Sequence, residues 1–206
     1  MSTTLILKAA QVARDAIHAR EAEIEHLDRA IGDGDHYINI KRGADTIIEM
    51  SDALAEKAPS EALKAIAMKL MSTVGGASGP LISSFFLAAA KTQGVDEPWT
   101  SDRVAAFVAD GVAGIQKRGK SDVGDKTMLD VLIPVANGLT AGVEAGKDAA
   151  TLRAEATATA KAGMEATRDI TARFGRAAFL GERAVGHIDP GAMSSYVIIA
   201  AICEDL

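Results

Sequence analysis

Apolar residues recur along most of the chain with the 3.6-residue period of an α-helix, and short stretches rich in glycine, proline and polar residues separate the periodic segments. This pattern predicts eight helices, over residues 3–31, 37–56, 61–74, 80–93, 102–118, 126–144, 148–173 and 192–203. The first segment is expected to form either one bent helix or two, and Pro134 is expected to kink the sixth helix. No run of strict alternation predicts a strand, so the expected fold class is all-α.

The loops between these helices differ in chemical character according to their order along the chain. Acids, glycine turns and basic residues gather in the loops after the odd-numbered helices, at 32–36, 75–80, 119–125 and 175–191. Such clusters are missing from the loops after the even-numbered helices, at 56–60, 94–100 and 144–148. Helices joined by short connections run antiparallel, so alternate loops lie at the same end. We therefore expect residues 1–206 to form a single domain with one site at one end.

Composition narrows the function classes. Hydrophobic residues make up 48% of the chain but aromatic residues only 4%, and 40 of the 206 residues are alanine, which favours closely packed helices. The 22 basic and 28 acidic residues give a net charge of −6, which argues against nucleic-acid binding. No apolar segment is long enough to span a membrane or to act as a signal peptide, and the lone Cys203 cannot form an internal disulfide, so we expect a cytoplasmic protein.

Three carboxylates, those of Asp28, Asp33 and Asp35, fall within eight residues around a glycine-containing turn. Like charges so close repel one another unless a cation compensates them. Oxygen ligands without cysteine or a second histidine suit Mg²⁺ rather than zinc. An EF-hand is excluded, because Tyr37 and Ile38 stand where the calcium loop needs an Asp or Asn followed by a glycine. The alternative to a metal site is a solvated acidic loop.

The stretch from Gly75 to Pro80 (Gly-Gly-Ala-Ser-Gly-Pro) offers free backbone N–H groups and one hydroxyl at the start of a predicted helix. Oriented N–H donors and the positive end of a helix dipole bind phosphate. A glycine-rich turn without a ligand has the same sequence pattern. Beside the three acids, however, the pattern favours a site in which carboxylates hold Mg²⁺ and Mg²⁺ holds a phosphate.

The two remaining loops carry weaker signals. Residues 119–127 are not a Walker A motif, because Asp125 is one residue too many before Lys126 and the preceding segment is helical. This loop is either a wall that contacts a base or ribose, or a plain polar connection. The last loop carries charge suited to phosphate and a tight turn, at Arg173, Arg176, Arg183 and Asp189-Pro190-Gly191.

Four motifs follow one another in the order of a known family. They are Leu27-Asp-Arg-Ala-Ile-Gly-Asp-Gly-Asp-His36, the stretch Gly75 to Pro80, Gly124-Asp-Lys-Thr-Met128 with Asp130, and Gly181-Glu-Arg183 continuing to Gly186-His-Ile-Asp-Pro-Gly-Ala192. With these motifs the chain resembles the ADP-binding L subunits of phosphoenolpyruvate-dependent dihydroxyacetone kinases. The resemblance implies an up-and-down antiparallel barrel of about eight amphipathic helices, with a nucleotide site at one rim.

The resemblance also implies roles for particular residues. Asp28, Asp33 and Asp35 would ligate two Mg²⁺ ions that bridge the phosphates of ADP or ATP. The nucleotide would contact His36, Tyr37, Ile38, Asn39, Ala77, Ser78, Gly119, Met128, Arg176, Asp189, Pro190 and Gly191. The family usually has glycine at position 37, so Tyr37 is expected either to narrow the approach to the phosphates or to alter a docking surface.

By the same resemblance, the chain would be a phosphoryl-transfer subunit. A phosphohistidine on the M subunit of a phosphotransferase system would rephosphorylate the bound Mg-ADP, and the ATP formed would phosphorylate dihydroxyacetone held on the K subunit. A transcriptional regulator is a further candidate partner.

Two alternatives stay open. One is a nucleotide-binding subunit of an ATP-dependent kinase for a related ketose or polyol, and the other is a non-catalytic, nucleotide-loaded interaction module. The length of 206 residues and His36 favour the phosphoenolpyruvate route, because the fused ATP-dependent enzymes of the family are longer and commonly have Cys or Thr at that position.

Overall fold

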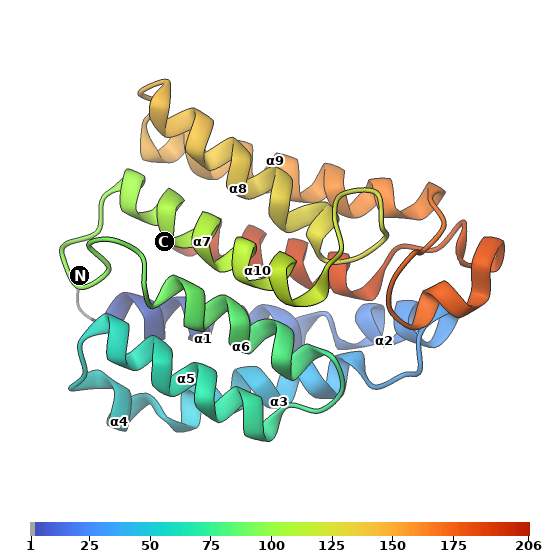
Figure 1. Ribbon diagram of the computed structural model, residues 1–206, viewed down its shortest axis with the longest axis horizontal. Coiled ribbons are helices and arrows are strands. Elements are labelled where there is room, and N and C mark those ends of the chain that lie inside the picture. The colour runs from blue at the N-terminus through green and yellow to red at the C-terminus, as the bar shows by residue number, and fades with distance from the viewer. Residues whose placement is uncertain (1–2) are drawn as a thin grey trace.

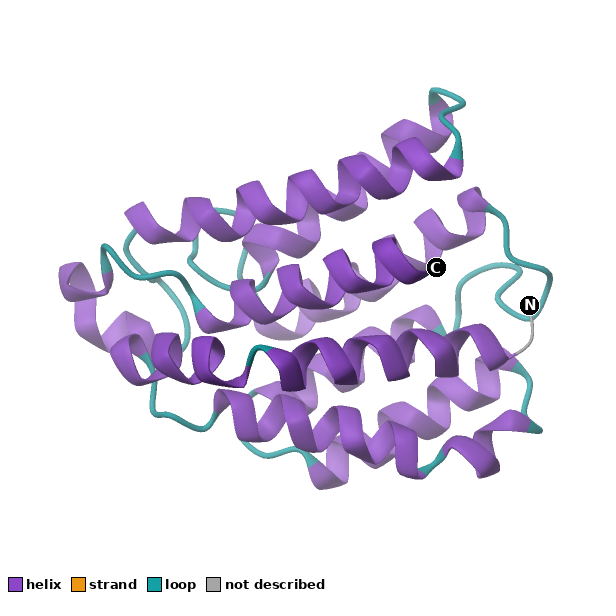
Figure 2. Cartoon of the chain, turned by 180° about the vertical axis from the view of Figure 1, so that it is seen from behind, coloured by secondary structure: helices purple, strands orange, loops and turns teal. Residues whose placement is uncertain are grey.

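The structure, a computed structural model, describes residues 3–206, and every regular element within them is helical. The α-helices are α1 (Thr3–Ala19), α2 (Glu21–Ile31), α3 (His36–Glu49), α4 (Ser51–Ala55), α5 (Pro59–Thr73), α6 (Ser78–Ala89), α7 (Ser101–Gly119), α8 (Leu129–Glu144), α9 (Ala149–Ala166) and α10 (Pro190–Asp205). Two 3₁₀ segments, η1 (Thr167–Asp169) and η2 (Arg176–Ala184), lie between α9 and α10. The axes of the long helices are roughly aligned with one another, and loops connect the helices at both ends (Figure 2).

Eight of the helices close into a ring. Each packs against two neighbours, in the order α1, α3, α5, α6, α7, α8, α9, α10 and back to α1. Successive members of the ring run in opposite directions, and the segments that join them lie at alternate ends of the barrel (Figure 1). The predicted up-and-down antiparallel barrel of about eight helices is therefore confirmed. No helix within residues 3–206 has the length and apolar character needed to cross a membrane.

The loops that share chemical character also share one end of the barrel. These are the connections at 32–35, 74–77, 120–128 and 167–189, which lie on the right of Figure 1. We call this the site end. The start of α1 and the end of α10 lie at the other end of the barrel (Figure 1). The alternation of loop chemistry along the sequence thus corresponds to a real asymmetry of the molecule.

Some helix boundaries differ from those predicted. Of the two forms expected for residues 3–31, one bent helix or two helices, the structure has two, because the backbone leaves the helical region at Arg20 (φ −113°, ψ 19°). The helix α8 runs through Pro134, but it begins at Leu129 rather than at 126, since Lys126 adopts a left-handed φ of 60°. The helix α9 ends at Ala166 rather than at 173. Beyond it, the carbonyls of Thr167 and Ile170 accept hydrogen bonds from the Lys126 side chain.

Small residues let neighbouring helices approach closely. A Cβ atom on Gly111 of α7 would lie only 2.3 Å from the ring of Phe85 on α6. The α9 helix buries Ala156 and Ala160, in the same apolar cluster as Ala192 of α10. The high alanine content therefore serves close packing around the ring, where larger side chains would force the helices apart.

Candidate functional site

A cavity of about 620 Å³ opens at the site end, and all four loops of that end contribute to its lining. One part of the lining is acidic and comes from the α2–α3 loop. Another part is apolar and comes from the ends of α6, α7 and α8, with Leu81, Ile115 and Leu129. The volume lies in the range of about 300–1,000 Å³ that is usual for small-molecule sites.

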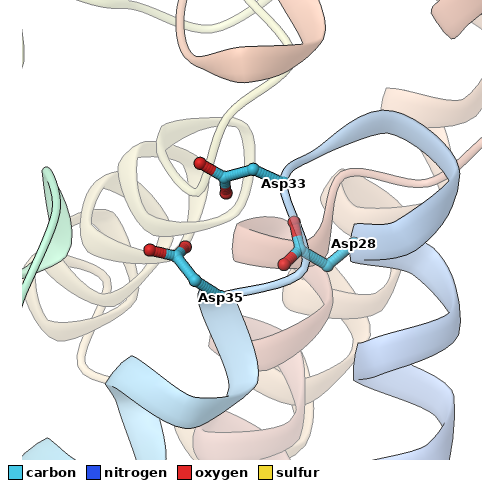
Figure 3. A group of neighbouring side chains, drawn as sticks. All are labelled: Asp28, Asp33 and Asp35. Carbon is cyan, nitrogen blue, oxygen red and sulfur yellow. The ribbon is translucent and has the colours of Figure 1, made fainter.

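The three predicted metal ligands converge in this cavity. Asp28 projects from the last turn of α2, and Asp33 and Asp35 follow in the loop, with their carboxylates directed toward one another (Figure 3). One oxygen from each carboxylate lies within 4.8 Å of the others. Asp28 is buried, whereas Asp33 and Asp35 are exposed. The fold thus brings together the three acids, with one of them anchored in the protein interior.

The position of Asp28 is set by two neighbours. Its Oδ2 accepts a hydrogen bond of 2.9 Å from the backbone N–H of His36, the first residue of α3. Gly32 provides the space for the other oxygen, because a Cβ atom at this position would lie 1.8 Å from Asp28 Oδ1. The carboxylate is therefore oriented by the protein itself, as an efficient ligand for a metal should be.

The electrostatics of the three acids favour a cation. Partial loss of solvent around its carboxylate raises the pKa of Asp35, and the neighbouring Asp33 and the charge of Asp28 raise it further. A hydrogen bond from Asn39 acts in the opposite direction. Mutual repulsion of this kind is relieved when a divalent cation binds between the carboxylates. The donor set consists only of carboxylate oxygens, which is the ligand type that Mg²⁺ prefers, so the residues fit the metal that the sequence predicts.

Arg176, the first residue of η2, reaches across to the acids. Its Nε lies 2.7 Å from Asp33 Oδ2, and 69% of its side chain is exposed. An exposed ion pair contributes only about 0–1 kcal/mol, so little stability is lost when this guanidinium turns to another anion. Of the three arginines singled out in this loop, only Arg176 lines the cavity. Arg173 instead lies 3.5 Å from Asp125, on a side chain that is 75% exposed.

Most of the residues expected to contact the nucleotide also line this cavity. They are His36, Ala77, Ser78, Gly119, Met128, Arg176, Asp189, Pro190 and Gly191. The side chains at 37–39 do not. Ile38 is 50% exposed and lines a separate surface groove on α3, and Asn39 is buried behind Asp35. Nucleotide contacts at 37–39 stay a prediction, and they would have to involve the backbone at the start of α3.

Tyr37 lies in the protein interior rather than at the cavity. Its ring is 3% exposed and belongs to the same apolar cluster as Ile24 and Ile40. Its hydroxyl donates a 3.0 Å hydrogen bond to Glu21 Oε2, and burial followed by that acidic partner raises the pKa of Tyr37 to about 12. The expectation that this phenol narrows the approach to the phosphates or alters a docking surface therefore differs from the structure, because an apolar ring gains more by packing inward.

Asp189 serves as the N-cap of α10 beside the cavity. Its Oδ2 accepts a 2.7 Å hydrogen bond from the backbone N–H of Ala192, and Pro190 occupies the first helical position. Burial raises the pKa of Asp189 to about 7, although the hydrogen bond from Ala192 and the charge of Lys126 oppose the rise. A half-buried carboxyl at the cavity wall thus titrates near neutral pH.

Sequence reasoning missed several residues of the site. The apolar lining formed by Leu81, Ile115 and Leu129 looks in the sequence like ordinary helix core, because its position at the ends of three helices is a property of the fold. Asp130 organises the 120–128 loop, since its two oxygens accept hydrogen bonds from the N–H groups of Gly124 and Thr127 at 2.6 and 2.7 Å. The sequence places Asp130 in a family motif with Gly124-Asp-Lys-Thr-Met128, but it does not predict this role.

The chain is thus an all-helical protein, within the residues that the structure describes, with an acid-lined cavity for a small molecule at one end of its ring of helices. Residues 30–204 match the DAK2 domain family, and the chain belongs to that family. The matched range includes Asp33, Asp35 and all of the other loops at the site end.

Relatives of the chain are kinase subunits or parts of longer kinases. The PEP-dependent dihydroxyacetone kinase, ADP-binding subunit DhaL, of Escherichia coli (strain K12) is 38% identical over 194 residues, which cover 94% of this chain and 92% of that protein. The PTS-dependent dihydroxyacetone kinase, ADP-binding subunit DhaL, of Lactococcus lactis subsp. lactis is 41% identical over 190 residues, 92% of this chain and 91% of that protein. Human triokinase/FMN cyclase is 33% identical over 187 residues, 90% of this chain but 32% of that protein.

A solved structure shares the fold. The dihydroxyacetone kinase from C. freundii, crystallised in complex with AMP-PNP and Mg²⁺, superposes with a TM-score of 0.76 at 26% sequence identity. The alignment covers 100% of this chain and 34% of that chain. The whole helical ring described here therefore corresponds to about a third of that longer kinase.

Proposed function

We propose that this chain is the ADP-binding phosphoryl-transfer subunit of a phosphoenolpyruvate-dependent dihydroxyacetone kinase. The observation that carries the proposal is the trio of carboxylates within 4.8 Å of one another, in a cavity of about 620 Å³ shared by four loops. Support also comes from the relatives named as ADP-binding subunits, which match over nearly their whole length, and from the AMP-PNP and Mg²⁺ complex of the structural relative.

In this proposal, Asp28, Asp33 and Asp35 hold Mg²⁺, and two ions are expected from the family resemblance. The metal neutralises phosphate charge, which together with positioning is most of what phosphoryl transfer requires. The bound ADP would take a phosphoryl group from a phosphohistidine partner, which is left with free histidine. The ATP formed would give its γ-phosphoryl group to dihydroxyacetone on the K subunit, and ADP would stay bound. The chain need not supply a general base of its own.

The other residues of the cavity bind and orient the nucleotide. Backbone N–H groups around Ala77, together with the Ser78 hydroxyl at the start of α6, are suited to phosphate. Arg176 adds a positive charge near the acids, where it can exchange Asp33 for a phosphate oxygen. The apolar lining near Leu81 and Ile115 suits the base. The acidic and apolar parts of the cavity thus match the two ends of a nucleotide.

The surface around the cavity supports contact with partner proteins. Seven large apolar side chains are exposed within residues 3–206, namely Ile38, Met68, Met71, Val123, Phe174, Phe179 and Val185. They lie in the first turn of α3, the second half of α5 and the loops 120–128 and 167–189, and so at or near the site end. Contiguous exposed apolar area marks interaction sites, and we propose that several of these side chains contribute to one. Partners that give or take the phosphoryl group would dock on that surface.

The experiment that tests the proposal measures binding and transfer separately. Calorimetry should show tight binding of ADP that depends on Mg²⁺, and the metal stoichiometry should be two per chain. With purified K and M subunits, phosphoenolpyruvate and dihydroxyacetone, a substoichiometric amount of ADP should support many turnovers, while labelled ADP on the chain exchanges slowly with free nucleotide. Absence of Mg-dependent ADP binding, or transfer that requires excess free ATP, would refute the proposal.

A matched pair of variants locates the site. Asp35→Asn removes one of the three carboxylate charges and should weaken Mg-ADP binding markedly. Asp52→Asn makes the same chemical change at an exposed position of α4, at the other end of the barrel, and should leave Mg-ADP binding unchanged. Transfer without loss in the Asp35 variant would contradict the metal assignment. A chain that binds Mg-ADP but transfers nothing to the K subunit would instead be a nucleotide-loaded interaction module.

A further inference from the structure

Lys126 has the largest fully buried side chain within residues 3–206, with 1% of its surface exposed. Its backbone has a left-handed φ of 60°, which residues other than glycine seldom adopt. Burying an ammonium group is costly unless its N–H donors find acceptors. Burial lowers the pKa of Lys126, while the charges of Asp189, Asp169 and Asp130 favour the protonated form. The folded chain must therefore offset the cost of burying this ammonium group by giving its N–H groups hydrogen-bond acceptors.

The ammonium group donates to three backbone carbonyls. Its Nζ lies 2.5 Å from the carbonyl oxygen of Thr167, 2.6 Å from that of His187 and 3.2 Å from that of Ile170. All three acceptors belong to the segment 167–189 that joins α9 to α10. Thr167 and Ile170 lie where the segment leaves α9, and His187 lies where it returns to α10. One side chain therefore ties both ends of the segment to the 120–128 loop.

Few other interactions join these two parts of the chain. The backbone N–H of Arg173 donates to the carbonyl of Asp125 at 3.1 Å, and the exposed Arg173 guanidinium lies 3.5 Å from the Asp125 carboxylate. The middle of the segment packs against Ile31 of α2 through several alanines and Leu180, in an apolar cluster that includes no residue of the 120–128 loop. The buried Lys126 contacts are thus the strongest direct link between the segment and the loop.

The two parts that Lys126 joins form separate parts of the cavity lining. The segment and the start of α10 contribute Arg176, several of its neighbours at 174–179 and residues 189–191. The loop and the start of α8 contribute Ser121 and residues 126–129, so Lys126 also borders the cavity. The distance between these parts decides whether both contact the same ligand. A site whose binding groups are already spaced before the ligand arrives loses less free energy on binding.

We propose that Lys126 is a positioning residue for the nucleotide: its ammonium group joins the 167–189 segment to the 120–128 loop and so sets the spacing of the two cavity walls that contact the nucleotide. The inference rests on the proposed function, since it takes the ligand of this cavity to be Mg-ADP. Lys126 borders the cavity, but its ammonium group donates to three backbone carbonyls of the protein, so we assign it the role of orienting the groups around the ligand.

The geometry requires lysine rather than arginine. An ammonium group is a compact donor with three diverging N–H bonds, which suits three carbonyls that surround one point. A guanidinium group is planar and larger, and it cannot direct three bonds from one nitrogen to these acceptors. Methionine has nearly the same length as lysine but no donor, so it removes the hydrogen bonds to all three carbonyls, of which that of the buried Thr167 has least access to water. Lys126→Arg thus keeps the positive charge but changes the geometry of the donors, whereas Lys126→Met removes both the charge and the donors.

The test measures Mg-ADP affinity and trypsin cleavage for Lys126→Met and Lys126→Arg. It compares them with a control variant that also lowers the free energy of unfolding, but far from the cavity. Both Lys126 variants should bind Mg-ADP about 10- to 100-fold more weakly, the loss typical when a residue that orients binding groups is removed. Trypsin should cut faster at the arginines of the 167–189 segment, which a general loss of stability would not single out. The control is Leu63→Ala, a buried position on α5 toward the end remote from the cavity, and it should keep wild-type affinity and wild-type cleavage in the segment.

The possible outcomes separate the two proposals. If the wild-type chain does not bind Mg-ADP, the proposed function fails and the role of Lys126 in nucleotide binding fails with it. If the wild type binds but both Lys126 variants bind equally well, only the positioning role is refuted. The same refutation follows if Leu63→Ala loses as much affinity as they do, because the loss then reflects stability alone. If Lys126→Met does not fold, Lys126→Arg, which keeps the charge, decides the question by the same two measurements.

Discussion

Replacing Gly32 with alanine would test the metal site through a residue that has no functional group of its own. The added Cβ would lie 1.8 Å from Asp28 Oδ1, whereas ordinary contact begins at 3.4 Å, so the oxygen must move by about 3.4 − 1.8 = 1.6 Å. The dihedral angles of residue 32 suit alanine, because the backbone there is extended (φ −117°, ψ −153°), although the Cβ would also lie 2.8 Å from the Asp28 carbonyl oxygen. Bonds from Mg²⁺ to oxygen are only about 2.0–2.1 Å long and tolerate little distortion, so the shift takes Asp28 out of reach of the metal.

The expected result is a loss of Mg-ADP affinity of about 10- to 100-fold by calorimetry. Displacement of Asp28 also disturbs its hydrogen bond from the His36 N–H, so the free energy of unfolding should fall by about 1–3 kcal/mol. The fold itself should persist, since the three atoms that the Cβ would approach most closely, all within 3 Å, belong to Asp28, at the end of α2. Circular dichroism and urea unfolding would check this.

Gly138→Ala is the matched control, because it makes the same chemical change inside α8. A Cβ at Gly138 meets nothing within 4 Å, and alanine in a helix interior is up to about 1 kcal/mol more favourable than glycine. The control should therefore unfold at a higher urea concentration and bind Mg-ADP as the wild type does. Wild-type affinity in Gly32→Ala would refute the reasoning, since it would show that the position of Asp28 does not matter for the ligand.

Further predictions concern charge and the docking surface. Partial desolvation and Asp33 raise the pKa of Asp35, so the charge of Asp35 destabilises the metal-free protein at neutral pH. The Asp35→Asn variant should therefore melt at or above the wild-type temperature in EDTA at pH 7. A clear drop in melting temperature would contradict this. The pKa of Asp189, raised to about 7 mainly by burial, means that the folded chain binds that proton more tightly than the unfolded chain, so stability should fall as pH rises from about 4 through 7. Asp189→Asn keeps a cap acceptor and should flatten this fall between pH 5.5 and 8 in urea unfolding; an unchanged pH slope would count against the assignment. Val123→Glu and Met68→Glu, at side chains that are 52% and 67% exposed, should leave Mg-ADP binding intact but slow transfer with the partner subunits, and normal transfer rates in both would remove this surface from the docking site.

Local features of the chain could be predicted from the sequence because they depend on neighbours in sequence. The helical period reflects one apolar face per segment, and short loops force neighbouring helices to run in opposite directions. The four chemically distinctive loops therefore had to meet at one end, as they do. Asp28, Asp33 and Asp35 lie within eight residues, so a single turn was enough to bring their carboxylates together.

Contacts between distant segments were decided by the tertiary structure alone. Nothing local to Lys126 indicates that its side chain is buried, since the three carbonyls that accept its hydrogen bonds lie 41, 44 and 61 residues further along the chain. The same contacts end α9 early, against a helical pattern that continues past Ala166. The Tyr37 side chain points inward because its ring packs in an apolar cluster formed with other helices and its hydroxyl donates a hydrogen bond to Glu21 of α2. Periodicity describes which face of a helix is apolar, but only the packed ring determines what that face, and each buried polar group on it, will meet.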